Sequence, residues 1–152
     1  MSVAFRRDSD EEHKEPRFAL PIPAGPNLVT PRGLAQIEAR VAELEAETGG
    51  DEAALADRKR TLAYWRTRLA TAEVTPARTD GEAGFGCRVA FTLGGAARTI
   101  DIVGDDEAEP NAGRLAFTAP LAHALIGGAA GDVIDFNGQP GAIEILDVEA
   151  IT

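Results

Sequence analysis

The stretch CRVAFTLGGAARTIDIVGDDEAEPNAG, from Cys87 to Gly113, decides the fold of this chain. Two apolar runs, CRVAFTL and ARTIDIV, flank Gly94–Gly95, and this pattern predicts a β-hairpin closed by a tight two-residue turn. An acidic loop follows directly and carries four carboxylates, on Asp105, Asp106, Glu107 and Glu109. The loop could coordinate a metal, hold a substrate or dock a partner, or it could be only a solvated connection between strands.

The residues after the acidic loop extend the same pattern to the end of the chain. RLAFTA reads as a third strand, and PLAHALIGG reads as a short helix that begins at Pro120 and ends at Gly127–Gly128. DVIDF and AIEILDVEAI then flank NGQPG, which predicts a second hairpin. We therefore expect a small α+β domain over residues 84–152, preceded by a linker at 77–83.

Residues 29–76 show helical periodicity instead. Thr30 suits a helix N-cap and Pro31 the first helical position. Apolar residues then recur at spacings of three and four: Leu34, Ile37, Val41 and Leu44 before Gly49–Gly50, and Leu55, Leu62, Trp65 and Leu69 after it. With Asp51 capping the second helix, the pattern predicts an antiparallel helical hairpin, or coiled coil.

Residues 1–28 combine a charged start with the proline-rich FALPIPAGPN and lack periodicity. We expect this segment to be extended or disordered. The alternative is that Phe18, Leu20 and Ile22 pack onto the folded part.

Charge narrows the classes of partner. The net charge is −10, and residues 77–152 carry four basic against twelve acidic groups, so direct sequence-specific nucleic-acid binding is disfavoured and a basic protein partner fits better. Cys87 is the single cysteine, the N-terminus lacks the apolar region of a signal peptide, and Pro120 breaks the longest uncharged run. A cytoplasmic monomer without a membrane span is expected.

Motifs for a self-contained active site are weak. If Asp105 were position 1 of a calcium loop, Pro110 and Ala116 would stand where glycine and glutamate are needed. IGGAAGD lacks the Lys-Ser/Thr of a phosphate loop, and the two histidines, His13 and His123, form no recognisable triad. The sequence therefore predicts no enzyme activity, no intrinsic metal and no cofactor of its own.

Two blocks of residues carry a family resemblance. The first is Ile102-Val103-Gly104-Asp105-Asp106-Glu107-Ala108 with Pro110 and Gly113, and the second is Pro120, Ala122, Leu125-Ile126-Gly127 and Gly131-Asp132-Val133. At this spacing the chain resembles the Gre family (GreA/GreB) of bacterial transcription elongation factors, from about residue 86 to 148. Thr30 and Gly33 at the helical start match more weakly.

The resemblance implies an FKBP-like C-terminal domain that docks on the rim of the secondary channel of RNA polymerase. It also implies a coiled coil whose acidic tip shares a magnesium ion with the polymerase during transcript cleavage. The expected docking residues are on the acidic loop and the short helix: Asp105, Asp106, Glu107, Pro120, Leu121, Leu125 and Ile126. The acidic tip residues are Glu47, Asp51 and Glu52, which could also serve only as helix-dipole complements.

The chain departs from the family pattern at its tip. ETGGDEAALADR occupies the turn where the family has Asp-Leu-x-Glu-Asn, and each helix is shorter by roughly a dozen residues, or about 18 Å of reach. Ala119, His123 and Gly128 replace the usual serine, arginine and lysine. The arm length resembles that of the Rnk proteins.

The leading hypothesis is a polymerase-binding elongation regulator of the Gre type. The alternatives are an active transcript-cleavage factor, an Rnk-like regulator linked to nucleoside diphosphate kinase, and a peptidyl-prolyl isomerase. The isomerase rests on fold analogy alone, and the few phenylalanines of the C-terminal domain make an aromatic-lined pocket hard to build.

Overall fold

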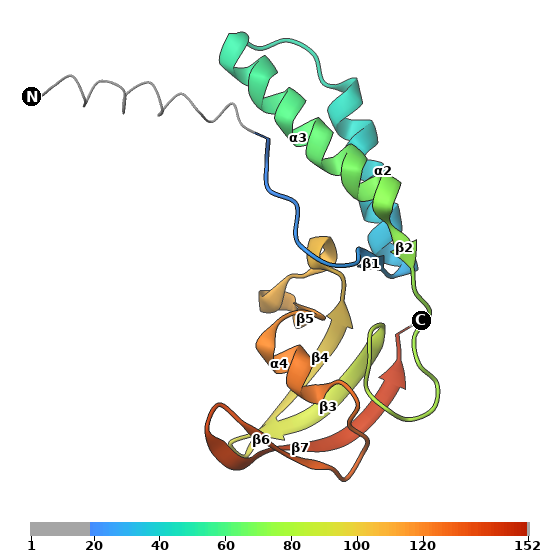
Figure 1. The fold of residues 1–152 in the computed structure, drawn as a ribbon, viewed down its shortest axis with the longest axis vertical. Coiled ribbons are helices and arrows are strands. Elements are labelled where there is room, and N and C mark those ends of the chain that lie inside the picture. Colours follow the sequence, from blue (N-terminus) through green and yellow to red (C-terminus); the bar gives the residue numbers. More distant parts are fainter. Residues whose placement is uncertain (1–18, 152) are drawn as a thin grey trace, which may run out of the picture. The chain divides into compact units, whose positions relative to one another are not determined.

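The computed structural model describes residues 19–151. Their helices and strands are β1 Leu28–Val29, α2 Pro31–Ala46, α3 Glu52–Thr71, β2 Glu73–Val74, β3 Cys87–Leu93, β4 Ala96–Val103, η2 Asp105–Glu107, η3 Pro110–Ala112, β5 Arg114–Ala116, α4 Pro120–Leu125, β6 Val133–Phe136 and β7 Gln139–Ala150 (Figure 1). The expected α+β class, with two long helices and a small sheet, is confirmed. Phe18, His13 and the charged start of the chain lie outside the described residues.

The described chain divides into two compact units. Of the described residues, the helical unit contains 19–24 and 37–71, and the sheet domain contains 25–36 and 72–151. The first turns of α2 therefore belong with the sheet domain. The segment 77–83, expected as a linker, also contributes to that domain, because Ala83 is fully buried and its N–H donates to the carbonyl of Gly128 at 2.7 Å.

The sheet domain is built on five strands in the order β5-β4-β3-β7-β6. The pairs β4–β3, β3–β7 and β7–β6 are antiparallel, whereas β5 pairs parallel with β4. A parallel pair cannot be joined by a tight turn, so the acidic loop with η2 and η3 makes the crossover between β4 and β5. A second, two-stranded sheet pairs β1 with β2 in parallel.

Glycine sets both hairpin turns. Gly94 and Gly95 take φ of +59° and +86° between β3 and β4, as the sequence predicts. In the second hairpin Asn137 and Gly138 alone make the turn, with φ of +55° and +81°, so Pro140 and Gly141 fall inside β7 and not in a longer loop.

The core of the sheet domain lies between one face of the sheet and α4 (Figure 1). Alternation along β3 turns Cys87, Val89 and Phe91 inward, and Ala122 and Leu125 of α4 close over them. The fully buried set continues with Ile102, Ile143 and Ile145. The N-cap of α4 is Ala119, which offers no side-chain cap, and Pro120 is the first helical residue.

The helical unit pairs α2 with α3 in antiparallel fashion (Figure 1). Ile37, Val41 and Leu44 of α2 are buried. On α3 the expected stripe is only partly covered: Leu55 is 46% exposed at the tip. Ion pairs cross between the helices, such as Arg66 to Glu45 at 2.8 Å.

Candidate functional site

The acidic loop sorts its four carboxylates into different environments. Glu107 is buried, Asp105 and Asp106 are half-buried, and Glu109 is exposed. Asp105 accepts a hydrogen bond from the hydroxyl of Thr118 at 3.0 Å, and Glu109 pairs with Arg114 at 2.5 Å. The loop is therefore not uniformly solvated, and its members cannot share one role.

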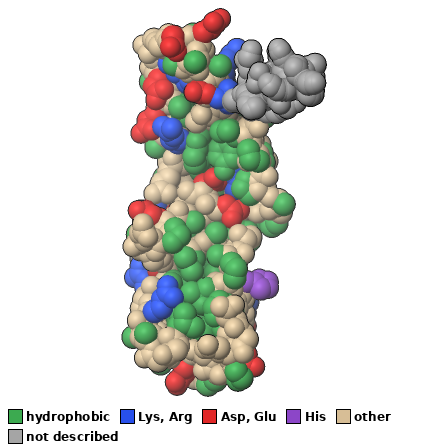
Figure 2. Space-filling model, turned by 90° about the vertical axis from the view of Figure 1, so that its left-hand side faces the viewer, with side chains coloured by type: hydrophobic (Ala, Val, Ile, Leu, Met, Phe, Trp, Pro, Cys, Tyr) green, Lys and Arg blue, Asp and Glu red, His purple; other side chains and the backbone are tan. Residues whose placement is uncertain are grey.

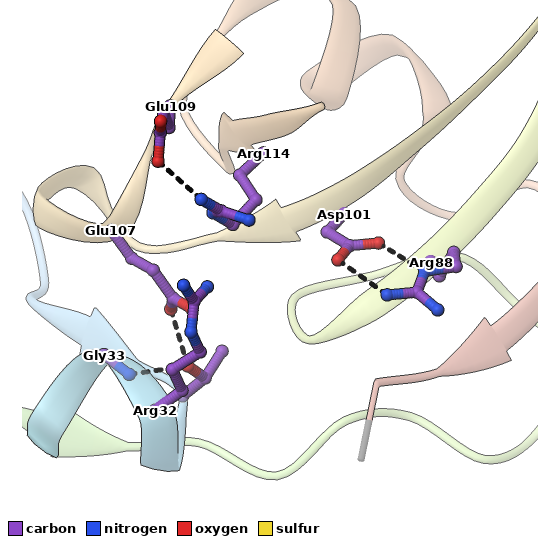
Figure 3. Close-up of polar contacts among 8 residues, drawn as sticks. Arg32, Gly33, Arg88, Asp101, Glu107, Glu109 and Arg114 are labelled. Atoms are coloured by element: carbon purple, nitrogen blue, oxygen red, sulfur yellow. Dashed lines mark hydrogen bonds and ion pairs between the residues drawn. The ribbon is translucent and has the colours of Figure 1, made fainter. Parts of the chain in front are cut away.

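Glu107 ties the acidic loop to the start of α2 (Figure 3). The Thr30 hydroxyl donates to one Glu107 oxygen at 2.5 Å, and Arg32 reaches the other oxygen at 3.3 Å. Thr30 Oγ1 in turn accepts the Gly33 N–H at 3.0 Å, which is the N-cap bond that the sequence predicts. Only 4% of the Glu107 side chain is exposed, so this carboxylate acts within the domain and offers little to a partner.

Two glycines make this close approach possible. A Cβ at Gly33 would lie 2.8 Å from Glu107 Oε1, and a Cβ at Gly104 would lie 2.3 Å from the carbonyl oxygen of Leu28. The second contact is with backbone, which cannot give way as a side chain can. Gly104 is therefore required where β1 crosses the beginning of the acidic loop.

A second ion pair lies on the neighbouring strands (Figure 3). Arg88 of β3 donates to both carboxylate oxygens of Asp101 on β4, at 2.7 and 3.0 Å. These hydrogen bonds raise the pKa of the Arg88 guanidinium above its ordinary value. The pair is directly opposed across the antiparallel ladder, where opposite charges stabilise the strand pairing.

Of the predicted docking residues around α4, some have buried side chains and others have side chains that a partner could reach. Leu125 is fully buried and serves the core, which excludes it from direct contact with a partner in this conformation. Pro120 is exposed, Leu121 is half-buried, and Ile126 is 39% exposed. Ile126 also lines a shallow hollow with Gly128, Asp132 and Val133.

Val133 is a candidate that sequence reasoning missed. It is 63% exposed at the start of β6 and lies beside Ile126 in the hollow. Alternation in VIDF would have placed Val133 and Asp135 on the outer face and Ile134 and Phe136 inward. Hydrophobic side chains gather on the face of the sheet domain that Figure 2 displays.

Charged side chains at the tip of the helical unit interact with neighbouring groups of the same tip. Asp51 caps α3 by accepting the Ala54 N–H at 2.9 Å. Arg58 pairs with Glu47 at 3.4 Å and donates to the carbonyl of Gly49 at 2.6 Å, whereas Glu52 is exposed in the first turn of α3. Two of the three predicted tip carboxylates are thus engaged locally.

Across residues 19–151, no three or more histidine, cysteine, aspartate or glutamate side chains come together where a metal ion could be held. The same residues contain no helix long and apolar enough to cross a membrane.

Comparison with known proteins concentrates on the sheet domain. Residues 78–150 match the family model described as transcription elongation factor GreA/GreB, C-terminal. The GreA of Rhizobium leguminosarum bv. viciae is 49% identical over 53 residues, and that of Mesorhizobium japonicum is 45% identical over 56 residues. These segments are 34% and 36% of this chain, and likewise of each relative, so the match spans about a third of the relatives' length.

Solved structures give a weaker likeness. Gfh1 of Thermus aquaticus superposes with a TM-score of 0.40 at 19% identity, covering 84% of this chain and all of that one. A GreA/GreB factor of Nitrosomonas europaea superposes with a TM-score of 0.38, also at 19% identity, over 82% of this chain and 98% of its own. Residues 78–150, which include the five strands of the sheet domain and α4, are therefore similar to the C-terminal domain of the GreA/GreB transcription elongation factors.

Proposed function

We propose that this protein is a transcription elongation regulator of the Gre type, which binds bacterial RNA polymerase at the rim of its secondary channel. The observation that carries the proposal is the family match over residues 78–150, the whole of the five-stranded sheet with α4. In this proposal the protein acts on the polymerase without an active site of its own, as a cytoplasmic monomer that needs no cofactor.

The proposed docking surface is the accessible part of the predicted set. It comprises Pro120, Leu121 and Ile126, extended by Val133, with Asp105 and Asp106 at its polar edge. An apolar centre with charged residues at the rim is typical of protein interfaces, and the carboxylates would steer association with a basic partner. Leu125 supports this surface from within the core, whereas Glu107 holds the acidic loop to the start of α2. A helix laid across one face of a mostly antiparallel sheet also agrees with the FKBP-like description.

Binding of the full-length protein to purified core RNA polymerase tests this proposal. Ile126→Asp should weaken binding at least tenfold, because it places a charge in the centre of an apolar contact. The charge reversal Asp105→Lys with Asp106→Lys should slow association and reduce its salt dependence. Leu146→Asp is the matched control, since Leu146 is also an exposed apolar residue (48%) but lies on β7, at the irregularity in its pairing with β3, outside the proposed docking surface. Equal loss in the Leu146 variant, or no binding by the wild type, would refute the docking proposal.

Active transcript cleavage is the second candidate function, because the tip of the helical unit does carry Glu47, Asp51 and Glu52. Against it, α2 and α3 contain 16 and 20 residues, which is about 24 and 30 Å of helix. Asp51 and Glu47 are also held by the α3 N-terminus and by Arg58. Metal positioning tolerates errors of only about half an ångström, so a short, locally neutralised tip favours binding without cleavage.

An Rnk-like regulator linked to nucleoside diphosphate kinase remains compatible with the short arms. Deletion of the gene would then change the cellular level of that kinase, whereas a general elongation regulator would alter pausing at many transcripts.

A further inference from the structure

A cavity of about 380 Å³ lies wholly within the sheet domain. Its walls come from residues 30–32 at the start of α2, from residues 75–77, and from strands β3, β4 and β5 together with Glu107. All of these residues belong to the same compact unit. The volume lies at the lower end of the range for small-molecule pockets, so it suits a small ligand and not a peptide.

Arginines are concentrated around this cavity. The sheet domain, counted over residues 25–36 and 72–152, has five arginines and no lysine against thirteen carboxylates, for a net charge of −8. Three of those five arginines, Arg32, Arg88 and Arg114, line the cavity, whereas only two carboxylates do, Asp101 and Glu107. The cavity wall is therefore net positive on a strongly acidic domain.

Two of the three guanidinium groups have donors to spare. Arg88 is held by Asp101 through two hydrogen bonds, but Arg32 makes a single 3.3 Å contact with Glu107 and keeps 54% of its side chain exposed. Arg114 donates from Nη2 to Glu109, while its Nε is buried and has no hydrogen-bond partner among residues 19–151. Burial of an unpaired donor is unfavourable, so the Arg114 guanidinium is not fully satisfied by the described residues of the domain.

The geometry points to a small organic phosphate as the ligand of this cavity. Arg32 and Arg114 would donate to the phosphate oxygens, with Arg88 adding charge from its fixed pair with Asp101. Guanidinium forks match phosphate oxygens in pairs, and the start of α2 adds the positive end of a 16-residue helix. Pro31, Pro76 and Ile151 would contact the apolar body of the ligand. None of the described residues that line the cavity is aromatic, so a stacked nucleobase is not expected.

This inference does not depend on polymerase binding, because it concerns the isolated protein. Isothermal titration calorimetry of the full-length protein with glycerol 3-phosphate, at constant ionic strength, should show saturable binding. Inorganic phosphate should bind more weakly since it lacks an apolar body, and glycerol should not bind. Equal affinity for the two phosphates would overturn the organic part of the proposal.

Three variants test whether the ligand binds in this cavity. Arg114→Gln and Arg32→Gln should each weaken glycerol 3-phosphate binding at least tenfold. Arg98→Gln should leave it unchanged, because Arg98 belongs to the same domain but stacks over Phe91 and does not line the cavity. Thermal unfolding checks that each variant folds. If Arg114→Gln does not fold, Arg32→Gln still tests the site, because more than half of the Arg32 side chain is exposed. Absence of saturable binding by the wild type, or an equal loss in Arg98→Gln, would overturn the proposal.

Discussion

The sheet domain and the helical unit of this chain are stabilised in different ways. The sheet domain closes a core in which Val89, Phe91 and Leu125 are fully buried by partners distant in sequence. The helical unit buries a narrow stripe on α2 and leaves Leu55 of α3 46% exposed. Its other contacts include partly exposed ion pairs, a helix cap, an edge-to-face contact between Tyr64 and Trp65, and the buried Arg68.

This difference agrees with where the chain resembles known proteins, because the sequence match lies in the sheet domain and not in the helical unit. Long-range packing constrains many positions at once, and the GreA/GreB match covers the sheet domain, from 78 to 150. A surface-rich helical pair tolerates changes of length and tip sequence, since exposed ion pairs contribute little to stability. We therefore expect large mutational effects in the sheet domain and small ones in the helical unit.

Phe91→Ala should have the largest effect. Phe91 is fully buried at the centre of β3, so truncation leaves a cavity and should lower the free energy of unfolding by about 3–5 kcal/mol. Urea unfolding followed by circular dichroism measures this loss. A loss below 1 kcal/mol would mean that the core does not stabilise the domain as described.

Glu107→Ala should come second, with a loss of about 2 kcal/mol. The change removes the buried acceptor of the Thr30 hydroxyl and the partner of Arg32. Glu109→Ala is the control in the same loop, because its exposed pair with Arg114 should be worth about 0–1 kcal/mol. Similar losses in the two variants would show that Glu107 is not a special link between the loop and residues 30–32.

Asp51→Ala should cost about 1 kcal/mol and act on the helical unit alone. It removes the side-chain cap on the Ala54 N–H, so the first turn of α3 should fray. Amide hydrogen exchange in residues 52–56 reports that fraying directly. The neighbouring Glu52→Ala is the control, and faster exchange in both variants alike would argue against a specific cap.

The smallest expected effect is the titration of Asp80. Hydrogen bonds from the Arg78 guanidinium lower the pKa of this exposed carboxyl to about 2. A depressed folded-state pKa stabilises the fold above the unfolded value near 4, and that contribution is lost as pH falls toward 2. Carboxyl carbon NMR should show the pKa of Asp80 returning toward its ordinary value in Arg78→Gln. An unshifted pKa in the wild type would contradict the pairing.

Local patterns predicted most of the elements. Gly94–Gly95 predicted the first hairpin, Thr30 with Pro31 predicted the start of α2, and Asp51 predicted the cap of α3. Each of these signals acts within a few residues, so it can be read from the sequence.

The features that sequence reasoning missed depend on distant partners. Strands β1 and β2 have two residues each, which is too short for any periodicity to show. The burial of Glu107 depends on Thr30, 77 residues away, and the cavity between residues 30–32 and the strands arises only when these segments meet. An acidic run therefore looked like one docking patch, although the fold gives its members separate roles.

Transcript cleavage by purified RNA polymerase on a backtracked complex, with binding followed in parallel, tests the central claim most directly. The account predicts binding through the sheet domain with no acceleration of cleavage at saturating protein. The account would be contradicted if the protein accelerated cleavage and the double variant Asp51→Asn with Glu52→Gln did not. The short tip would then stimulate transcript cleavage directly. Absence of binding would leave a domain similar in sequence to the GreA/GreB C-terminal domain but refute the proposed function.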